Sequence, residues 1–397
     1  MKFFSSKRNI ALLISLSGGL LLSLIYLLFY QKSENEITGS TRMIGYSASF
    51  IVFVTLYISF VAAKRTILAN IILIATLILC VELFCFFKLD MPSANKEIYP
   101  TPPSLPDDHI ANNIGSVPFA DSVYHSVLVK NNDTVFDIHA TIDSNCKRFT
   151  PNHSDERDMH ALFFGCSITY GEGVEDNETM PYCFQEMSGY NSYNFGLSGH
   201  STNHMLARIQ YKPLTLQVKE KKGVAFYIFF WDHIHRSIGS MDRYCSWLHN
   251  APYYYINDNK LKRDKMFYNG RKWISKFYEY AYQTNIVKKF GIDFPPKISE
   301  THLNLVAEMI RESKSEYLKQ FPGNEFYCVI YPDWANTDKS MIDDFKNKIK
   351  EKDIKLVDLT WFEYKAEHSL GGDPHPSPAT HAQISQIIFN EIASQNQ

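Results

Sequence analysis

The sequence has no excess of charge of one sign. Lys and Arg number 40 against 42 Asp and Glu, which gives a formal net charge of -2 over 397 residues. Nucleic-acid binding depends on a cationic surface that neutralises phosphates, and a nearly neutral chain has no global basic field to supply one. We therefore expect no nucleic acid among the partners. The length allows two or three domains.

Metal-ligand spacing is also lacking. The seven cysteines include no C-x-x-C pair, and five of them follow residue 88, an odd number from which spacing assigns no disulfide. The nearest histidine groupings are His200 with His204 and the run Asp232-His233-x-His235, and neither has an evident third ligand nearby. We expect neither a metal nor a cofactor.

Long hydrophobic runs, in contrast, fill the N-terminal part. Residues 9–30 and 43–63 carry no charged side chain, and residues 66–87 form a third run that only Glu82 interrupts. About 20 apolar residues cross a bilayer as a helix, whereas the apolar part of a cleaved signal peptide is shorter, roughly 7–15 residues. Residues 1–88 are therefore predicted to be a membrane domain of three transmembrane helices with the lipid bilayer as partner. Glu82 is expected to reach the headgroups.

Positive charges set the predicted orientation of these helices. Lys2, Lys7 and Arg8 hold the N-terminus in the cytoplasm, and Lys64-Arg65 places the second connection on the same side. Three spans then put residues 89–397 outside. We expect a multi-pass protein of the cytoplasmic (inner) membrane with its main domain extracytoplasmic.

The composition changes after residue 88. Residues 89–118 are rich in proline and polar side chains and predict an extended tether. Residues 119–158 contain a hairpin signal and predict a small β extension without chemistry of its own. From 159 to 397, apolar strands alternate with helices, which predicts an α/β fold with a parallel sheet and helices on both of its faces.

An insert at residues 236–296 interrupts this alternation. It is crowded with tyrosine, phenylalanine and tryptophan, with lysine and arginine between them. Such a composition suits stacking on sugars, contact with acyl chains or a membrane interface. It suits equally a helical cap with a small core of its own. We expect a helical cap that also roofs the active site.

The residues that carry chemistry lie at two distant points of the α/β region. The apolar run from Ala161 to Phe164 predicts a buried strand, Gly165 a turn, and Ser167 follows at the carboxyl end of that strand, where open α/β sheets bind ligands. A serine is a weak nucleophile until a base takes its proton. The run Asp373-Pro374-His375-Pro376 supplies a histidine next to a carboxylate.

Three segments resemble the SGNH (GDSL-type) hydrolases: residues 165–171, which read Gly-Cys-Ser-Ile-Thr-Tyr-Gly, residues 194–201, which read Asn-Phe-Gly-Leu-Ser-Gly-His-Ser, and residues 373–376. The resemblance covers Ala161 to the C-terminus and implies a three-layer, flavodoxin-like parallel sheet. It implies Ser167 as nucleophile, His375 as general base and Asp373 as the group that orients it. Backbone N–H groups of Ser167 and Gly199 would form the oxyanion hole.

The sequence departs from this family at three points. Cys166 replaces the usual aspartate, and one residue rather than two separates Asp373 from His375. The third block, Gly-x-Asn-Asp, is missing: the chain reads Phe-Phe-Trp-Asp-His over residues 229–233, so that Trp231 aligns with the oxyanion asparagine. His233 is the predicted substitute because it follows the same strand and carries an N–H. Cys166 is expected to be buried and inert.

The leading hypothesis is therefore a membrane-tethered serine ester hydrolase that acts outside the cytoplasmic membrane on an acyl ester of a glycan or lipid. A second hypothesis is an O-acyltransferase that modifies an envelope glycan. Three predicted transmembrane helices are too few to form the large acyl-carrying membrane domain that is fused to some such transferases. A separate membrane partner would then have to supply the acyl groups. A third is a catalytically degenerate domain that binds a glycan or acts as a scaffold, since the third block is missing.

Overall fold

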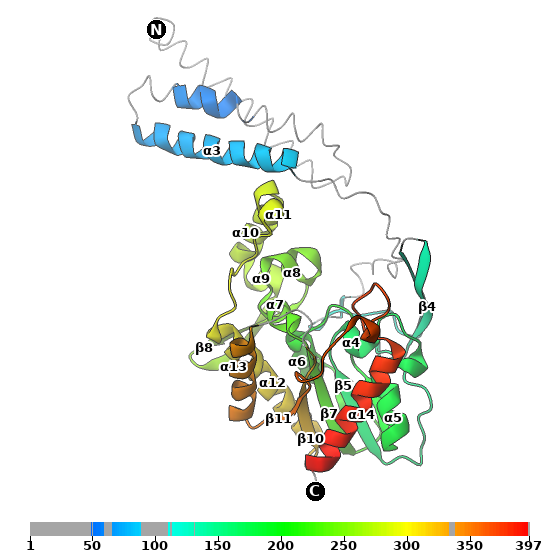
Figure 1. The fold of residues 1–397 in the computed structure, drawn as a ribbon. Helices are drawn as coiled ribbons and strands as arrows, with labels where there is room; N and C mark the ends of the chain where they lie inside the picture. The colour runs from blue at the N-terminus through cyan, green and yellow to red at the C-terminus, as the bar shows by residue number, and fades with distance from the viewer. Residues whose placement is uncertain are drawn as a thin grey trace, which may run out of the picture. The chain divides into compact units, whose positions relative to one another are not determined.

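The structure is a computed structural model, and it describes residues 49, 51–58, 66–88, 110–111, 113–130, 132–332 and 338–395. The chain divides into two compact units (Figure 1). One comprises residues 1–94 and 280–292, and the other residues 95–279 and 293–397. Of the predicted membrane helices, residues 9–30 lie outside the described residues, and residues 43–63 are described only at 49 and 51–58.

The described part of the first unit consists of residues 49 and 51–58, helix α3 (Thr66–Lys88) and the short helix α11 (Asn285–Phe290) with the residues around it. The Glu82 carboxylate is buried and accepts hydrogen bonds from the Asn285 backbone N–H (2.5 Å), the Asn285 Nδ2 (2.8 Å) and the Ile286 N–H (2.9 Å). Glu82 therefore binds the first N–H groups of α11. The sequence had instead predicted that Glu82 contacts lipid headgroups. Over the stretches of chain that the structure describes, no helix combines the length and apolarity that a membrane crossing requires.

The second unit is built on a five-stranded parallel sheet with the strand order β11-β10-β7-β5-β6. The strands are β5 (Met159–Phe164), β6 (Asn191–Asn194), β7 (Lys222–Phe229), β10 (Glu325–Ile330) and β11 (Lys355–Asp358). The central strand β7 is buried from Gly223 to Phe229, as expected for a strand covered on both faces. The predicted α/β fold with a parallel sheet is confirmed.

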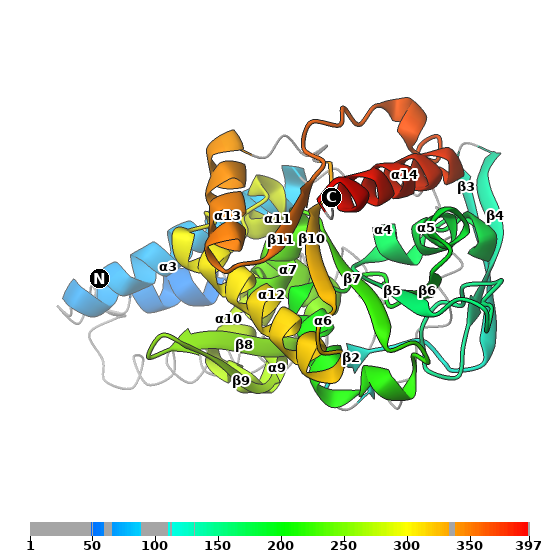
Figure 2. The same cartoon turned by 90° about the horizontal axis from the view of Figure 1, so that it is seen from below.

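Helices cover both faces of this sheet (Figure 2). On one face α6 (Thr202–Tyr211), α12 (Glu300–Gln320) and α13 (Lys339–Glu351) form a core with side chains such as Leu206, Ile310 and Phe345. On the other, α5 (Met180–Ser188) and α14 (Pro378–Gln395) pack through Phe184, Ile384 and Ile388. Short helical turns complete this part of the chain: α4 (Ser167–Tyr170), η3 (Asp176–Glu178), η4 (Leu214–Leu216) and η6 (Ala366–His368).

In the predicted β extension, residues 119–158, strands β3 (Ser122–Lys130) and β4 (Asp133–Ile142) form the expected hairpin. Before it, β1 (Ile110–Ala111) and β2 (Gly115–Ser116) form a short antiparallel pair within residues 89–118, where an extended tether was predicted. Residues 89–109 of that tether lie outside the described residues. Beyond the hairpin, Arg148 bridges to Ile142 on one side and to Asn194 of β6 on the other. The extension is thereby connected to the edge strand of the main sheet.

The insert is not wholly helical. It contains α7 (Asp232–Ile238), α8 (Met241–Arg243), a π-helical turn η5 (Tyr244–Leu248), the antiparallel hairpin β8 (Pro252–Asn257) and β9 (Lys260–Met266), α9 (Phe267–Gly270) and α10 (Lys272–Tyr282). The tyrosine-rich run in β8 favours a strand. Asp258 and Asn259 both adopt positive φ, as the tight hairpin turn requires.

The insert has a core of its own around Arg271. Its guanidinium lies 4.2 Å from the centre of the Phe267 ring and donates to the carbonyls of Ile238 (2.8 Å) and Gly239 (2.6 Å). Hydrogen bonds from this partly buried arginine, which directly follows α9, reach backbone carbonyls at the end of α7 and so connect the two segments of the insert.

Candidate active site

Ser167 is the first residue of α4, directly after the turn that ends β5. A Cβ on Gly165 would lie 2.1 Å from the Thr169 Oγ1, so only glycine fits between the strand and the helical turn. The Cys166 carbonyl accepts from the N–H groups of Thr169 (3.0 Å) and Tyr170 (2.8 Å), which fixes the turn. Cys166 itself is 1% exposed, so its thiol does not face the solvent.

Ser167, His375 and Asp373 form a continuous hydrogen-bonded chain. The His375 Nε2 lies 2.8 Å from the Ser167 Oγ, and the His375 Nδ1 lies 2.6 Å from the Asp373 Oδ1. An ionised carboxylate only accepts, so Nδ1 carries the proton and Nε2 is left to accept from the serine hydroxyl. The structure thus brings together the three predicted catalytic side chains in the arrangement that general-base activation needs.

The unusual one-residue spacing of the last segment has a structural explanation. The Asp373 Oδ1 also accepts the backbone N–H of His375 at 2.9 Å, so one carboxylate oxygen binds both the ring and the main chain of the same residue. Asp373 is 8% exposed. Burial acts to raise its pKa, but the hydrogen bonds and charge of His375, with Lys130, outweigh it and the pKa is lowered. Asp373 therefore stays ionised.

The second segment packs directly against the serine turn. The Asn194 Nδ2 donates to the carbonyls of Thr169 (2.9 Å) and Tyr170 (3.2 Å). Gly199 has a φ of 80°, which favours glycine. Within the part of the chain that the structure describes, the backbone N–H groups of Ser167 and Gly199 have no hydrogen-bond acceptor. Unpaired N–H groups are what an oxyanion hole requires.

Arg148 is a site residue that the sequence did not reveal. Its guanidinium is buried and donates to the carbonyls of Tyr170, Gly171 and Val174, while its Nε pairs with Asp176 at 3.0 Å. These carbonyls follow Ser167 in the chain. The β extension therefore supplies the side chain that holds the loop after Ser167. The sequence had predicted no role in the site for this extension.

His233, the predicted third oxyanion donor, does not line the cleft. Its ring has no exposed surface, and its Nδ1 faces the Tyr227 hydroxyl (2.8 Å) and the Phe230 N–H (3.3 Å). Burial, together with the nearby Arg236, holds the pKa of His233 well below its usual value, so the ring is neutral. An empty oxyanion hole is open to solvent, and a fully buried ring cannot line one. We therefore do not assign His233 to it.

Trp231, which aligns with the missing asparagine, also points into the core. Its ring packs edge-on to Phe229 (5.2 Å between centres) and Phe345 (5.7 Å) and is 4% exposed. Both candidate side chains after β7 are thus buried.

The next charged residues along α7 lie beside Gly199 instead. Asp232 accepts from the Arg236 Nε (2.5 Å) and the Arg243 Nε (2.9 Å). Burial acts to raise the pKa of Asp232, but the two guanidinium groups outweigh it and the pKa is lowered. A Cβ on Gly199 would lie 3.1–3.2 Å from the Trp247 indole, and that indole is 46% exposed. Trp247 therefore covers one side of the oxyanion glycine.

The two histidine groupings are not arranged around a metal position. The His200 and His204 rings stack with their centres 4.1 Å apart, and the His200 Nε2 lies 2.8 Å from the Ser116 carbonyl oxygen. Burial lowers the pKa of His200 to about 4. Among the residues with described positions, no three His, Cys, Asp or Glu side chains gather as a metal site would require.

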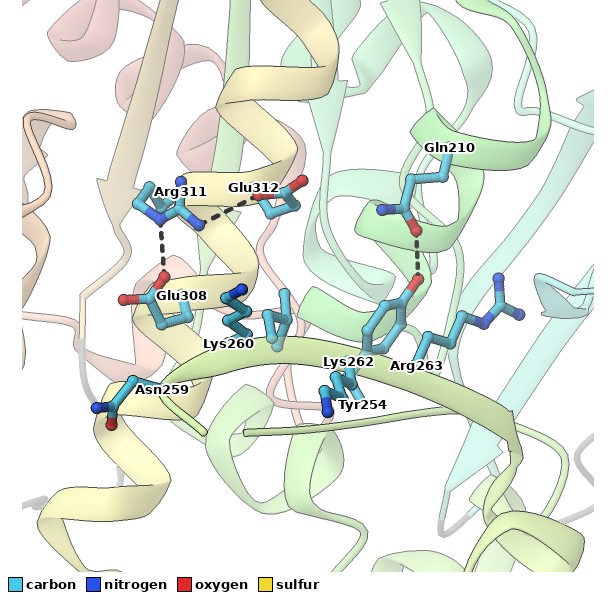
Figure 3. A pocket seen from close by; sticks show the side chains of 10 residues that line it. Gln210, Tyr254, Asn259, Lys260, Lys262, Arg263, Glu308, Arg311 and Glu312 are labelled. Carbon is cyan, nitrogen blue, oxygen red and sulfur yellow. Dashed lines mark hydrogen bonds and ion pairs between the residues drawn. The ribbon is translucent and has the colours of Figure 1, made fainter. Parts of the chain in front are cut away.

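A separate cavity of about 340 Å³ lies between α6, the hairpin β8–β9 and α12 (Figure 3). Part of its polar lining is internally paired: Arg311 binds Glu308 (2.7 Å) and Glu312 (3.2 Å), and the Tyr254 hydroxyl donates to Gln210 (2.8 Å). None of Ser167, His375 and Asp373 lines it. Since the serine, histidine and carboxylate of the triad lie elsewhere, we do not regard this cavity as the active site.

No protein-family profile and no curated protein matches the sequence. Solved structures with a similar chain path exist. A G-D-S-L family lipolytic protein from Desulfitobacterium hafniense has 10% identity and a TM-score of 0.34, with 58% of this chain and 98% of that chain covered. A family two carbohydrate esterase from Clostridium thermocellum has 12% identity and a TM-score of 0.36, covering 63% and 67%.

An acetyl xylan esterase from Butyrivibrio proteoclasticus is similar to the same degree, with 11% identity, a TM-score of 0.37 and coverage of 62% of this chain and 66% of that chain. All three similarities are too low to assign a family or a substrate. The functional argument therefore rests on the geometry of the site itself.

Proposed function

We propose that this protein is a serine esterase of the SGNH type. The observation that carries the proposal is the hydrogen-bonded chain from the Ser167 Oγ through the His375 ring to the Asp373 carboxylate. The unpaired N–H groups of Ser167 and Gly199 support it, because an acyl transfer needs donors for the oxyanion as well as a nucleophile. A domain that only binds a ligand has no use for both features.

The reaction follows from these positions. The Ser167 Oγ attacks the ester carbonyl carbon while its proton passes to the His375 Nε2, and the carbonyl electron pair moves to the oxygen held by the two N–H groups. The intermediate collapses as the alkoxide leaves and takes the proton from His375. Water then attacks the acyl-enzyme by the same route and releases the acid. Asp373 keeps the imidazole in the required tautomer and stabilises it when it is protonated.

The proposed substrate is an acyl ester of a glycan or lipid. The half-exposed indole of Trp247 beside Gly199 supports this class, since an exposed aromatic face stacks on sugar rings and contacts acyl chains equally well. The guanidinium groups of Arg236 and Arg243 lie 5.8 Å and 5.3 Å from the centre of that indole, so positive charge is present beside the exposed ring.

We further propose that the esterase is tethered to the cytoplasmic membrane with its active site outside. The apolar runs at residues 9–30, 43–63 and 66–87 support this proposal, as does the position of Lys64-Arg65 between the last two. Protease treatment of intact cells tests it: residues 89–397 should be degraded while the N-terminus is protected. Protection of the whole chain would contradict the orientation.

The catalytic proposal is tested by substitution of the nucleophile. Ser167→Ala should lower kcat on a short-chain aryl ester by at least about 1,000-fold and abolish labelling by a fluorophosphonate probe. Ser394→Ala, which removes an exposed hydroxyl from the end of α14, should change neither. If the wild-type protein takes up no probe, or if Ser167→Ala keeps its turnover, the esterase assignment is wrong.

A further inference from the structure

The proposed esterase lacks the side-chain donor that normally completes the oxyanion hole. Trp231 and His233, the two residues that the sequence offers in its place, are buried in the core at 4% and 0% exposure. Two backbone N–H groups remain, from Ser167 and Gly199. Removing one oxyanion donor costs about 100–1,000-fold in rate, so a third donor from another part of the chain would have a large effect.

Arg236 is the polar side chain of α7 that reaches this region. Its Nη1 donates to the carbonyl of His200 at 3.1 Å, and His200 directly follows Gly199 in the chain. Its Nε is held by Asp232 at 2.5 Å. The Nη2 has no hydrogen-bond partner among the described residues, and the side chain is 11% exposed. The Nε and Nη1 of the guanidinium are therefore held by protein acceptors, and the Nη2 remains available to donate to a bound ligand.

A further contact locates this guanidinium beside Gly199. Its centre lies 5.8 Å from the Trp247 ring, the same ring that covers Gly199. Burial acts to lower the pKa of Arg236, but Cys166 and Asp232 outweigh it and the pKa is raised. The geometry therefore places Arg236 at the Gly199 side of the proposed oxyanion hole. The guanidinium remains protonated throughout.

The position of Arg236 is fixed by a shared carboxylate. Asp232 and Arg236 are one helical turn apart, and the second oxygen of Asp232 binds Arg243 at 2.9 Å. Arg243 in turn lies 5.3 Å from the Trp247 ring. Since Asp232 is 15% exposed as a side chain, this pairing is shielded from water and holds the guanidinium more firmly than a surface ion pair would.

We propose that Arg236 supplies the side-chain donor of the oxyanion hole, through its Nη2, in place of the asparagine of the missing third segment. This inference rests on the proposed esterase activity. A guanidinium is a planar, permanently charged group with five N–H donors. As the carbonyl oxygen gains negative charge, a cationic donor stabilises that charge more than it stabilises the neutral ester. The effect therefore belongs to kcat rather than to KM.

The experiment compares Arg236→Ala, Arg236→Lys and Arg311→Ala in the full-length protein. Arg311 is a matched control, since its guanidinium is also ion-paired, to Glu308 and Glu312, but lines the separate cavity. On a short-chain aryl ester, Arg236→Ala should lower kcat by about 100-fold with KM changed little. Arg236→Lys should recover part of this loss because it keeps the charge, and Arg311→Ala should match the wild type.

Chemical rescue separates a direct role from a structural one. Millimolar guanidinium chloride should restore part of the activity of Arg236→Ala by occupying the vacated position, and it should leave Ser167→Ala inactive. A fluorophosphonate should also label Arg236→Ala more slowly, because the labelling reaction develops negative charge on the phosphoryl oxygen. Thermal melting checks that each variant is folded.

The outcomes are distinguishable. If Ser167→Ala is inactive while folded Arg236→Ala keeps the wild-type kcat, the role of Arg236 is wrong and the esterase proposal stands. If Arg236→Ala raises KM alone, Arg236 binds substrate and is not an oxyanion donor. If Ser167→Ala keeps its turnover, the esterase proposal fails and the inference fails with it.

Discussion

Burial decides what each histidine of this protein does. His375 is half-buried and lies between a serine and a carboxylate, so its ring is available for proton transfer. His233 follows the central strand β7, yet its ring has no exposed surface and is enclosed by aromatic side chains. The rings around His233, such as Tyr227 and Phe229, precede it closely in the sequence. The residue pattern nevertheless does not show whether the ring turns inward or outward where the strand ends.

The buried histidines predict a dependence of stability on pH. Burial, assisted by the nearby Arg208 and Arg236 and opposed by the hydrogen bond to Ser116, lowers the pKa of His200 to about 4. Its ordinary value is about 6.5. Between these values the unfolded chain binds a proton that the folded protein does not, so stability is full above pH 6.5 and falls as the pH is lowered towards 4.

Urea unfolding at pH 7, 6 and 5 measures this loss. His200→Gln removes the titrating group and should make the free energy of unfolding less dependent on pH over that range, even if the variant is less stable at pH 7. An unchanged slope would show that His200 does not contribute to the pH dependence.

At the scale of secondary-structure elements, the turn after β5 depends on the β extension. Arg148 lies outside the α/β fold in sequence, but its guanidinium binds three carbonyls of the segment that follows Ser167 and the carboxylate of Asp176. The Lys130 ammonium at the end of β3 donates to the Gly372 carbonyl at 2.7 Å, next to Asp373. Lys130 of the hairpin and Arg148 beyond it therefore contact the two loops that carry the triad.

Arg148→Lys tests this support. A lysine keeps the charge but cannot bind the carbonyls and Asp176 together, so buried acceptors lose their donors at a cost of roughly 2–4 kcal/mol in the free energy of unfolding. Acylation of Ser167 should slow as well, because the turn that carries it loosens. Arg157→Lys is the matched control, since Arg157 forms a partly exposed pair with Glu186, and it should change neither quantity. Equal effects of the two substitutions would rule out a special role for Arg148.

The elements themselves differ in how far the sequence predicts them. The strand alternation is readable where a strand is apolar on both faces, as in β7. The pairing of Asp373 with His375 can be predicted from the sequence because the two residues are only two positions apart. The roles of Arg148 and Arg236 cannot be predicted in this way, because their acceptors Gly171 and His200 lie 23 and 36 positions away. The hairpin β8–β9 was missed because its aromatic run also fits a helix.

At the scale of the whole molecule, the first unit joins two distant parts of the chain. Residues 280–292 belong to the insert of the α/β fold, yet they group with residues 1–94. The buried Glu82 carboxylate on α3 makes this connection by accepting N–H groups from Asn285 and Ile286. A carboxylate beside the first N–H groups of a helix is favourable because these have no partner within the helix.

Glu82→Ala should therefore release the start of α11. Hydrogen–deuterium exchange of the full-length protein should show faster exchange at Ile286 and at the following amides of α11, by about tenfold or more if roughly 1.4 kcal/mol of local stability is lost. Glu82→Gln keeps one acceptor oxygen and should give a smaller effect. Unchanged exchange in Glu82→Ala would mean that packing alone holds α11 in place.

Two members of the triad lie close together near the end of the chain, and the third lies far before them. This spacing determines when during synthesis the triad can assemble. Its base and carboxylate share one short loop, whereas the nucleophile precedes the base by 208 residues. A ribosome must therefore synthesise the whole sheet before it adds Asp373 and His375. Until then the chain contains Ser167 but no partner histidine to deprotonate it. The proposed esterase activity would therefore begin only after the loop before α14 has been synthesised.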